Sequence, residues 1–123
     1  MNLIQRIKRA LIDGSEADAL HKHVRTFAET TSVVTSVDGA TYAVLAADSV
    51  LLCDADTGDL TITLPAVASS DKRIVQVKKI TAANSVIIDG NAGETIDGDT
   101  TVTITTRYTS LTLACDGSAW HII

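Results

Sequence analysis

Two segments decide the fold: Leu60-Thr-Ile-Thr-Leu64 and Ile74-Val-Gln-Val-Lys78 both alternate apolar and polar side chains. Such alternation places the apolar side chains on one face of a β-strand, and the β-branched residues Thr, Val and Ile favour this conformation. The same composition begins near Val33 and continues to Ile123. We therefore predict a mainly β domain over residues 33–123.

Turn-forming pairs such as Asp38-Gly39 and Asp116-Gly117 divide this region into short strands. The predicted strands are Val33–Val37, Tyr42–Ala46, Ser49–Cys53, Leu60–Leu64, Arg73–Ile80, Ser85–Asp89, Thr101–Thr105, Ser110–Cys115 and Ala119–Ile123. Short strands separated by frequent turns are typical of a β-sandwich or a barrel-like module. The Thr-rich stretch 85–106, punctuated by Gly and Asp, fits either a repetitive fibrous arrangement or ordinary hairpins. The order of the strands in the sheets stays open.

The first 32 residues follow a different pattern and are predicted to form an N-terminal helix and linker. Apolar residues recur here at spacings of three and four, with basic residues between them, which predicts a short amphipathic helix. The residues concerned are Leu3, Ile4, Arg6, Ile7, Lys8, Arg9 and Leu11. No later segment is predicted to be a helix that covers this stripe. We therefore expect it to attach the protein to a partner, with a three-helix bundle as the alternative.

Size and charge exclude several classes of protein. The chain has 123 residues, of which 46% are hydrophobic, which suits one globular domain. A net charge of −5 and only 3% aromatic residues argue against nucleic-acid binding, which needs basic surfaces and stacking rings. The sequence contains no apolar run long enough to span a membrane. Binding of the basic helix to a membrane surface remains a weaker alternative.

Charge is also divided unevenly along the chain. Residues 1–25 carry five Lys and Arg against three Asp and Glu, whereas the remainder carries five against twelve. The two parts are therefore expected to face different surroundings, and the basic helix suits an acidic partner.

Few residues have the character of a metal site, and we predict no metal and no other cofactor. His21 and His23 could supply imidazole ligands, but no acidic or Cys ligand is adjacent, so solvated linker histidines are expected. The sequence around Asp54, Asp56 and Asp59 is too short for a calcium loop and lacks its Glu, which predicts turn residues instead.

The sequence also contains no recognisable catalytic constellation. A Gly-x-Ser-x-Gly elbow is absent, and paired-carboxylate chemistry on sugars would need aromatic platforms. Cys53 and Cys115 lie at the ends of predicted strands and are expected to be buried free thiols, with a disulfide as the alternative. We expect a protein that is not an enzyme.

Several motifs occur together in one order. They are Tyr42-Ala-Val-Leu-Ala-Ala-Asp48, Leu60-Thr-Ile-Thr-Leu-Pro65, Arg73-Ile-Val-Gln-Val-Lys78, Val86-Ile-Ile-Asp89, Glu94-Thr-Ile-Asp-Gly98, Tyr108-Thr-Ser-Leu-Thr-Leu113 and Asp116-Gly-Ser-Ala-Trp-His-Ile-Ile123. This order, over about residues 40–123, resembles a small β-module of tailed-bacteriophage virion proteins, found in tail fibres, tail spikes and head fibre or decoration proteins. The resemblance implies a non-enzymatic homotrimer in a virus particle that is assembled in the cytoplasm of a bacterial host.

The expected function is therefore that of a capsid decoration, cement or head-fibre protein, anchored by its N-terminal segment to the major capsid protein or another virion protein. The alternative is a tail fibre or spike module that binds a host surface glycan. In either case Trp120, Ile122 and Ile123 are predicted to fill the core or a subunit interface, and sugar stacking by Trp120 is the alternative.

Overall fold

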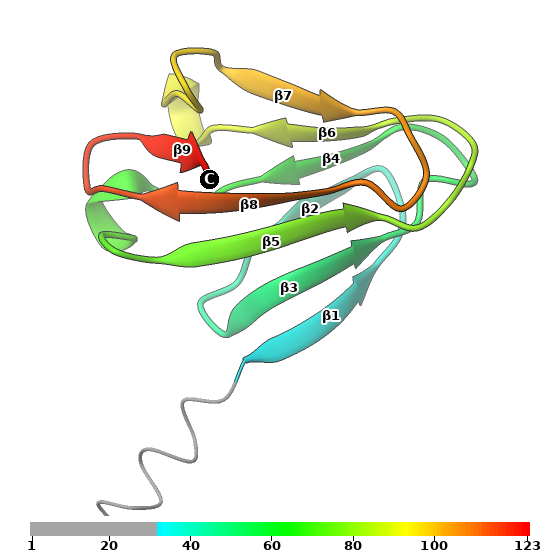
Figure 1. Ribbon diagram of the computed structural model, residues 1–123, viewed down its shortest axis with the longest axis horizontal. Helices are drawn as coiled ribbons and strands as arrows, with labels where there is room; N and C mark the ends of the chain where they lie inside the picture. Colours follow the sequence, from blue (N-terminus) through cyan, green and yellow to red (C-terminus); the bar gives the residue numbers. More distant parts are fainter. Residues whose placement is uncertain (1–31) are drawn as a thin grey trace, which may run out of the picture. The chain divides into compact units, whose positions relative to one another are not determined.

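The computed structural model describes residues 32–123, and this part of the chain is mainly β (Figure 1). Its strands are β1 (Val33–Val37), β2 (Thr41–Ala43), β3 (Asp48–Cys53), β4 (Leu60–Thr63), β5 (Ile74–Lys79), β6 (Val86–Asp89), β7 (Thr101–Ile104), β8 (Ser110–Cys115) and β9 (Trp120–Ile122). Two short 3-10 turns, η1 (Val67–Ser69) and η2 (Asn91–Gly93), lie between strands. The predicted mainly β character is confirmed. The predicted N-terminal helix lies outside the described residues.

All nine predicted strands occur in the structure, most of them within one residue of their predicted ends. The largest difference is in β2, which ends at Ala43 and not at Ala46. The chain turns early there because the Leu45 N–H donates to Asp48 Oδ2 at 2.8 Å and the Asp48 N–H donates to the Leu45 carbonyl at 3.1 Å. A contact between Leu45 and the side chain three residues later thus shortens the strand, and alternation of residues does not reveal such a contact.

The strands form two mixed sheets, which are consistent with a β-sandwich. Sheet A has the order β1-β3-β5-β8-β9, and sheet B has the order β2-β4-β6-β7. Figure 1 shows β7, β6 and β4 in the upper part of the domain, β8, β5, β3 and β1 below them, and β2 behind the strands of sheet A. Apolar side chains from both sheets form a single core cluster between the layers.

The first six strands alternate between the two sheets, and within each sheet they pair in parallel. The chain therefore winds through three successive coils, β1 with β2, β3 with β4, and β5 with β6. Parallel pairing requires a crossover between consecutive partners, and here each crossover contains a strand of the opposite sheet. Residues 33–89 thus form a repetitive arrangement, whereas the Thr-rich stretch 85–106, for which the sequence left a repetitive and a hairpin arrangement open, pairs β6 with β7 as an antiparallel hairpin.

The last three strands pair in the opposite sense. β7 lies antiparallel to β6, β8 antiparallel to β5, and β9 antiparallel to β8. The β8–β9 connection is a tight hairpin in which Gly117 has a φ of 90°, a conformation that glycine adopts without strain. Antiparallel strands therefore extend both sheets beyond the third coil.

Both cysteines are buried and free, as expected from the sequence. Burial raises the pKa of the Cys53 thiol to about 12, so this group stays protonated at neutral pH. Cys115 is likewise packed away, with its Sγ 3.8 Å from the Val67 carbonyl oxygen. Neither thiol is available as a nucleophile.

The coils are joined by polar side chains as well as by the apolar core. Asp48 is only 5% exposed, and its carboxylate accepts hydrogen bonds of 2.7 Å from both Thr35 in β1 and Tyr42 in β2. Arg73, directly before β5, donates to the carbonyls of Leu45 at 2.6 Å and Asp48 at 2.8 Å. These bonds connect all three coils at the end of sheet A where β3 and β5 begin.

A buried lysine performs a similar role at the other end of β5. Lys79 is 0% exposed, and its ammonium group donates to the carbonyl of Thr81 and, at 3.1 Å, to that of Ala83. A buried charge needs such partners to offset the loss of water. Lys79 therefore holds the connection between β5 and β6 against the end of its own strand.

The predicted C-terminal residues occupy three different environments. Trp120 is 0% exposed within the core, Ile122 is partly buried against it, and Ile123 is 70% exposed. Trp120 has no free ring face, so the alternative of sugar stacking by this residue is wrong. Its Nε1 donates a long hydrogen bond of 3.4 Å to the Pro65 carbonyl.

We predict that Trp120→Ala lowers the free energy of unfolding by about 3–5 kcal/mol, because it leaves a large cavity between the sheets. Chemical denaturation followed by far-UV circular dichroism measures the loss. Thr103→Ala is the control, since Thr103 is exposed on the outer side of β7 and its removal should cost no more than about 0.5 kcal/mol. Equal effects of the two substitutions would contradict the central position of Trp120.

Candidate functional site

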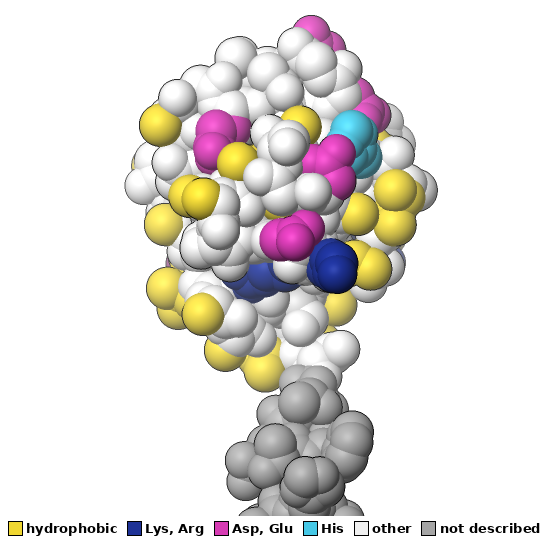
Figure 2. Space-filling view, turned by 90° about the vertical axis from the view of Figure 1, so that its left-hand side faces the viewer, with side chains coloured by type: hydrophobic (Ala, Val, Ile, Leu, Met, Phe, Trp, Pro, Cys, Tyr) yellow, Lys and Arg dark blue, Asp and Glu magenta, His cyan; other side chains and the backbone are white. Residues whose placement is uncertain are grey.

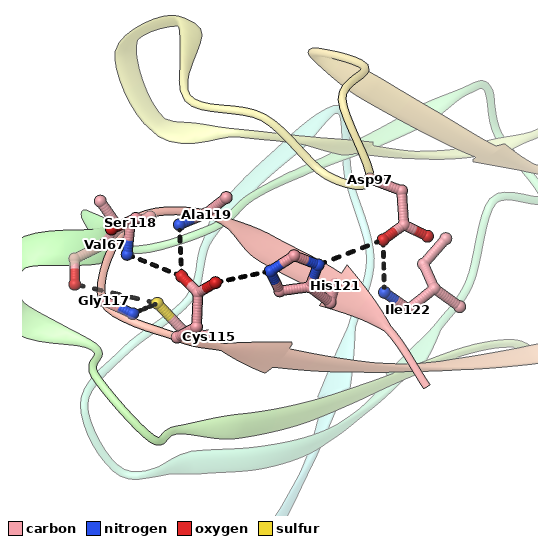
Figure 3. Close-up of polar contacts among 9 residues, drawn as sticks. Val67, Asp97, Cys115, Gly117, Ser118, Ala119, His121 and Ile122 are labelled. Atoms are coloured by element: carbon pink, nitrogen blue, oxygen red, sulfur yellow. Dashed lines mark hydrogen bonds and ion pairs between the residues drawn. The ribbon is translucent and has the colours of Figure 1, made fainter.

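A cluster of Asp97, Asp116 and His121 lies on the surface at the C-terminal end of the chain (Figure 3). The three side chains are about half exposed, with fractions of 46% for His121, 47% for Asp97 and 53% for Asp116. Figure 2 shows histidine in cyan beside acidic side chains in magenta on this end of the molecule. We call these three residues the carboxylate–histidine cluster.

The β8–β9 hairpin places two members of the cluster together. Register pairs Ala114 with His121, which leaves Asp116 in the turn between the strands. One carboxylate oxygen of Asp116 accepts from the N–H groups of Ser118 and Ala119, both at 2.8 Å. The other oxygen lies 2.8 Å from His121 Nε2.

The third member comes from a separate turn. Asp97 has a φ of 48°, and its N–H donates to the Trp120 carbonyl at 3.0 Å, which brings the turn beside β9. Its Oδ1 accepts from the Ile122 N–H at 3.3 Å and lies 3.6 Å from His121 Nδ1. Each ring nitrogen of His121 therefore faces one carboxylate (Figure 3).

This geometry changes the titration of two groups. The N–H groups of Ser118 and Ala119, together with His121, lower the pKa of Asp116 from 3.8 to about 2. The hydrogen bond with Asp116 is the largest influence that raises the pKa of His121 above 6.5, and the charge of Asp97 acts in the same direction. The cluster therefore favours a protonated imidazole that is held between two carboxylates.

The chemistry of the cluster is that of an ionic link. A general base needs a free ring nitrogen within hydrogen-bonding reach of a substrate, but both nitrogens of His121 are directed at carboxylates. The link joins β9 to the β8–β9 turn and to the turn around Asp97. It holds the strand that carries Trp120 in place.

A second feature is a shallow pocket of about 180 Å³ at the ends of β1, β3 and β5. Its lining residues are Ser36, Val37, Asp38, Leu52, Asp54 and Ile80. Asp54 uses its carboxylate locally, because Oδ1 accepts from the Asp56 N–H at 2.9 Å. Asp59 similarly accepts from the Ser85 N–H at 2.8 Å. Asp54 and Asp59 thus serve as turn residues, as predicted.

Two of the predicted sites belong to the N-terminal part of the sequence. The stripe from Leu3 to Leu11 and the pair His21 and His23 lie outside the described residues. Within residues 32–123, no group of three or more His, Cys, Asp or Glu side chains is arranged to hold a metal ion. No helix in the same range has the length and apolar character that crossing a membrane requires.

Sequence reasoning missed the carboxylate–histidine cluster. The hairpin signal Asp116-Gly117 and the nearby His121 could have indicated one of its contacts, since residues beside a tight turn are neighbours. Nothing local indicates Asp97, which reaches the cluster only because its turn lies against β9.

Comparison with known proteins adds no assignment: no protein-family model and no curated protein matches this chain.

We predict that His121 makes the stability of the domain depend on pH near neutrality. Its pKa is raised in the folded state, so its contribution is complete below about pH 6.5 and is lost as the pH rises through the raised value. The melting temperature should therefore fall over this interval, and His121→Gln should remove the fall. Thermal unfolding between pH 5.5 and 8.5 measures it.

The matched control is the double variant H21Q/H23Q, which replaces the other two histidines of the chain. This variant should keep the pH dependence of the parent protein. A dependence that disappears with H21Q/H23Q and persists with His121→Gln would contradict the prediction.

Proposed function

We propose that this protein is a non-enzymatic structural protein of a bacteriophage virion. On this proposal it is a homotrimeric capsid decoration, cement or head-fibre protein. Its β-domain projects from the particle, and its N-terminal segment attaches it to the major capsid protein or another virion protein. The proposal rests on the sequence resemblance and on the part that the resembling residues play in the fold.

The observation that carries the proposal is that the residues of the motifs build the framework. Glu94 begins one of these motifs, and its carbonyl oxygen lies so near the neighbouring Gly90 that a Cβ at position 90 would be 1.9 Å away, so only glycine fits there. Glu94 in turn accepts from the Val67 N–H at 3.1 Å and joins two connections. Together with Asp48 and Trp120, these residues serve a rigid module, which is what a virion structural role requires.

Attachment through the N-terminal segment is supported by charge. Residues 1–25 carry a net positive charge, whereas the remainder of the chain is acidic. Because opposite charges attract, this basic segment favours contact with an acidic partner surface. The apolar stripe from Leu3 to Leu11 adds a hydrophobic component to this contact. In this proposal the N-terminal segment binds the particle and the β-domain forms the exposed part.

A host-glycan function is the second candidate, and two observations favour it. Tyr108 is 59% exposed, with the Arg107 guanidinium 4.6 Å and the Lys78 ammonium 5.6 Å from its ring centre. The outer face of sheet B carries threonine hydroxyls on three strands, at Thr41, Thr61, Thr63, Thr101 and Thr103. Exposed rings and hydroxyls are groups that sugars bind.

We predict that deletion of residues 1–14 leaves a folded homotrimer that no longer decorates particles. The reason is that the deletion removes the stripe and three of the basic residues while the β-domain keeps its core. Light scattering measures the oligomeric state, and co-sedimentation with undecorated particles measures attachment.

A substitution of Tyr108 by Ala serves as the comparison in the same assay. It should leave decoration unchanged and would abolish glycan-array binding if the second candidate were correct. Monomers after the deletion would favour the three-helix bundle, and normal decoration by the deleted protein would exclude attachment through this segment.

A further inference from the structure

The outer face of sheet A combines exposed aliphatic side chains with outward strand positions that carry no Asp or Glu. Its apolar residues are Val34, Val50, Leu52, Ile74, Ala114 and Ile123. Val34 is 61% exposed, Ile74 53% and Ile123 70%, so large apolar groups meet solvent over β1, β5 and the residue after β9. Figure 2 shows hydrophobic side chains in yellow at the surface near the histidine. We call this surface the outer face of sheet A.

Strand register makes these side chains neighbours. Val34, Val50, Gln76 and Thr112 stand in one row across β1, β3, β5 and β8. Gln76 and Thr112 share a hydrogen bond of 3.1 Å, which satisfies part of the polar surface in the middle of the row. Ile123 continues the row, because its N–H donates to the Thr112 carbonyl at 2.9 Å. The row therefore runs without a break from β1 through β3, β5 and β8 to the residue after β9.

The charge on this face differs from the charge of the chain as a whole. The chain carries a net charge of −5, yet no Asp or Glu occupies an outward position of β1, β3, β5, β8 or β9. Asp48, the one carboxylate within these strands, is buried and bonded to Thr35 and Tyr42. Copies of an acidic protein repel one another. The middle of this face, away from Asp97 and Asp116 beside His121 on β9, is where copies can approach without opposed carboxylates.

The face is small for a contact between only two copies. Five strands spaced about 4.8 Å apart, with about six residues of about 3.3 Å each, cover roughly 24 by 20 Å. Three such faces around one axis would bury on the order of 1,400 Å² in total, which is about 480 Å² for each pair of subunits and below the usual range of one specific interface. A closed trimer therefore depends on all three contacts forming together. Sheet B is less suited, since Thr41, Thr61 and Thr103 share its corresponding row and Asp89 also faces outward.

We infer that the outer face of sheet A is the surface through which copies of this chain contact one another around a threefold axis. The inference rests on the proposed homotrimer and assigns it a surface. Val34, Val50 and Ile74 supply the apolar contact, and the Gln76–Thr112 pair lies at its centre. The outer face of sheet B then remains exposed on the assembled protein.

The test is the double variant V34E/I74E in the full chain, with Ile87→Glu as the matched control on β6, an inner strand of sheet B. Sedimentation velocity over a concentration series gives the monomer–trimer midpoint. Near-UV circular dichroism of Trp120 reports folding. We expect V34E/I74E to raise the midpoint about tenfold or more, because it places like charges in an apolar contact, and Ile87→Glu to leave it unchanged.

A second variant, V34T/I74T, keeps β-branched side chains and decides the question if V34E/I74E does not fold. It should raise the midpoint in the same direction, though by less. Trimers that persist unchanged in the folded variants overturn the inference while the homotrimer stands, and so does dissociation by Ile87→Glu alone. A full chain that is monomeric throughout overturns the proposed homotrimer and this inference together.

Discussion

The carboxylate of Asp48 connects strands whose register parallel pairing alone does not fix. Main-chain hydrogen bonds between parallel strands repeat evenly, so a strand can shift along its neighbour unless side chains oppose it. Asp48 opposes such a shift because it accepts from Thr35 in the first coil and Tyr42 in the crossover, while Arg73 binds the Asp48 carbonyl from the third coil. Burial alone would raise the pKa of Asp48, but the hydrogen bonds from Leu45, Thr35 and Tyr42 and the charge of Arg73 together lower it.

With register set in this way, each strand presents one side chain inward and the next outward. The inward positions form one continuous core that includes Leu51, Val77 and Trp120. The outward positions separate into two chemically distinct surfaces, aliphatic on sheet A and hydroxyl-rich on sheet B. A scaffold with two different faces can make a subunit contact on one side and leave the other exposed, as the proposed virion role requires.

The C-terminal strand β9 carries buried and exposed side chains next to one another. Trp120 is buried, His121 points outward between Asp97 and Asp116, and Ile122 packs against the core. β9 has only three residues, and main-chain pairing over so short a length contributes little alone. Core burial of Trp120 and the carboxylate–histidine cluster together hold it.

By itself the sequence determined the strands and the direction of their side chains. Alternation in Leu60–Leu64 and Ile74–Lys78 decides which residues can be buried, and the hydrophobic effect then drives those residues inward whatever the order of strands. Trp120 was predicted to fill the core or a subunit interface, and the structure places it in the core. The same reasoning correctly identified Cys53 and Cys115 as buried free thiols.

Only the tertiary structure decided which strands are neighbours. Backbone N–H and C=O groups are alike in every residue but proline, so alternation fits a parallel coil and an antiparallel hairpin equally well. Thr35 and Tyr42 contact Asp48, and Asp97 contacts His121. These contacts join residues up to 24 positions apart, so no local pattern encodes them. The outer face of sheet A arises for the same reason, because Val34, Val50 and Ile74 become one surface only after the coils have stacked.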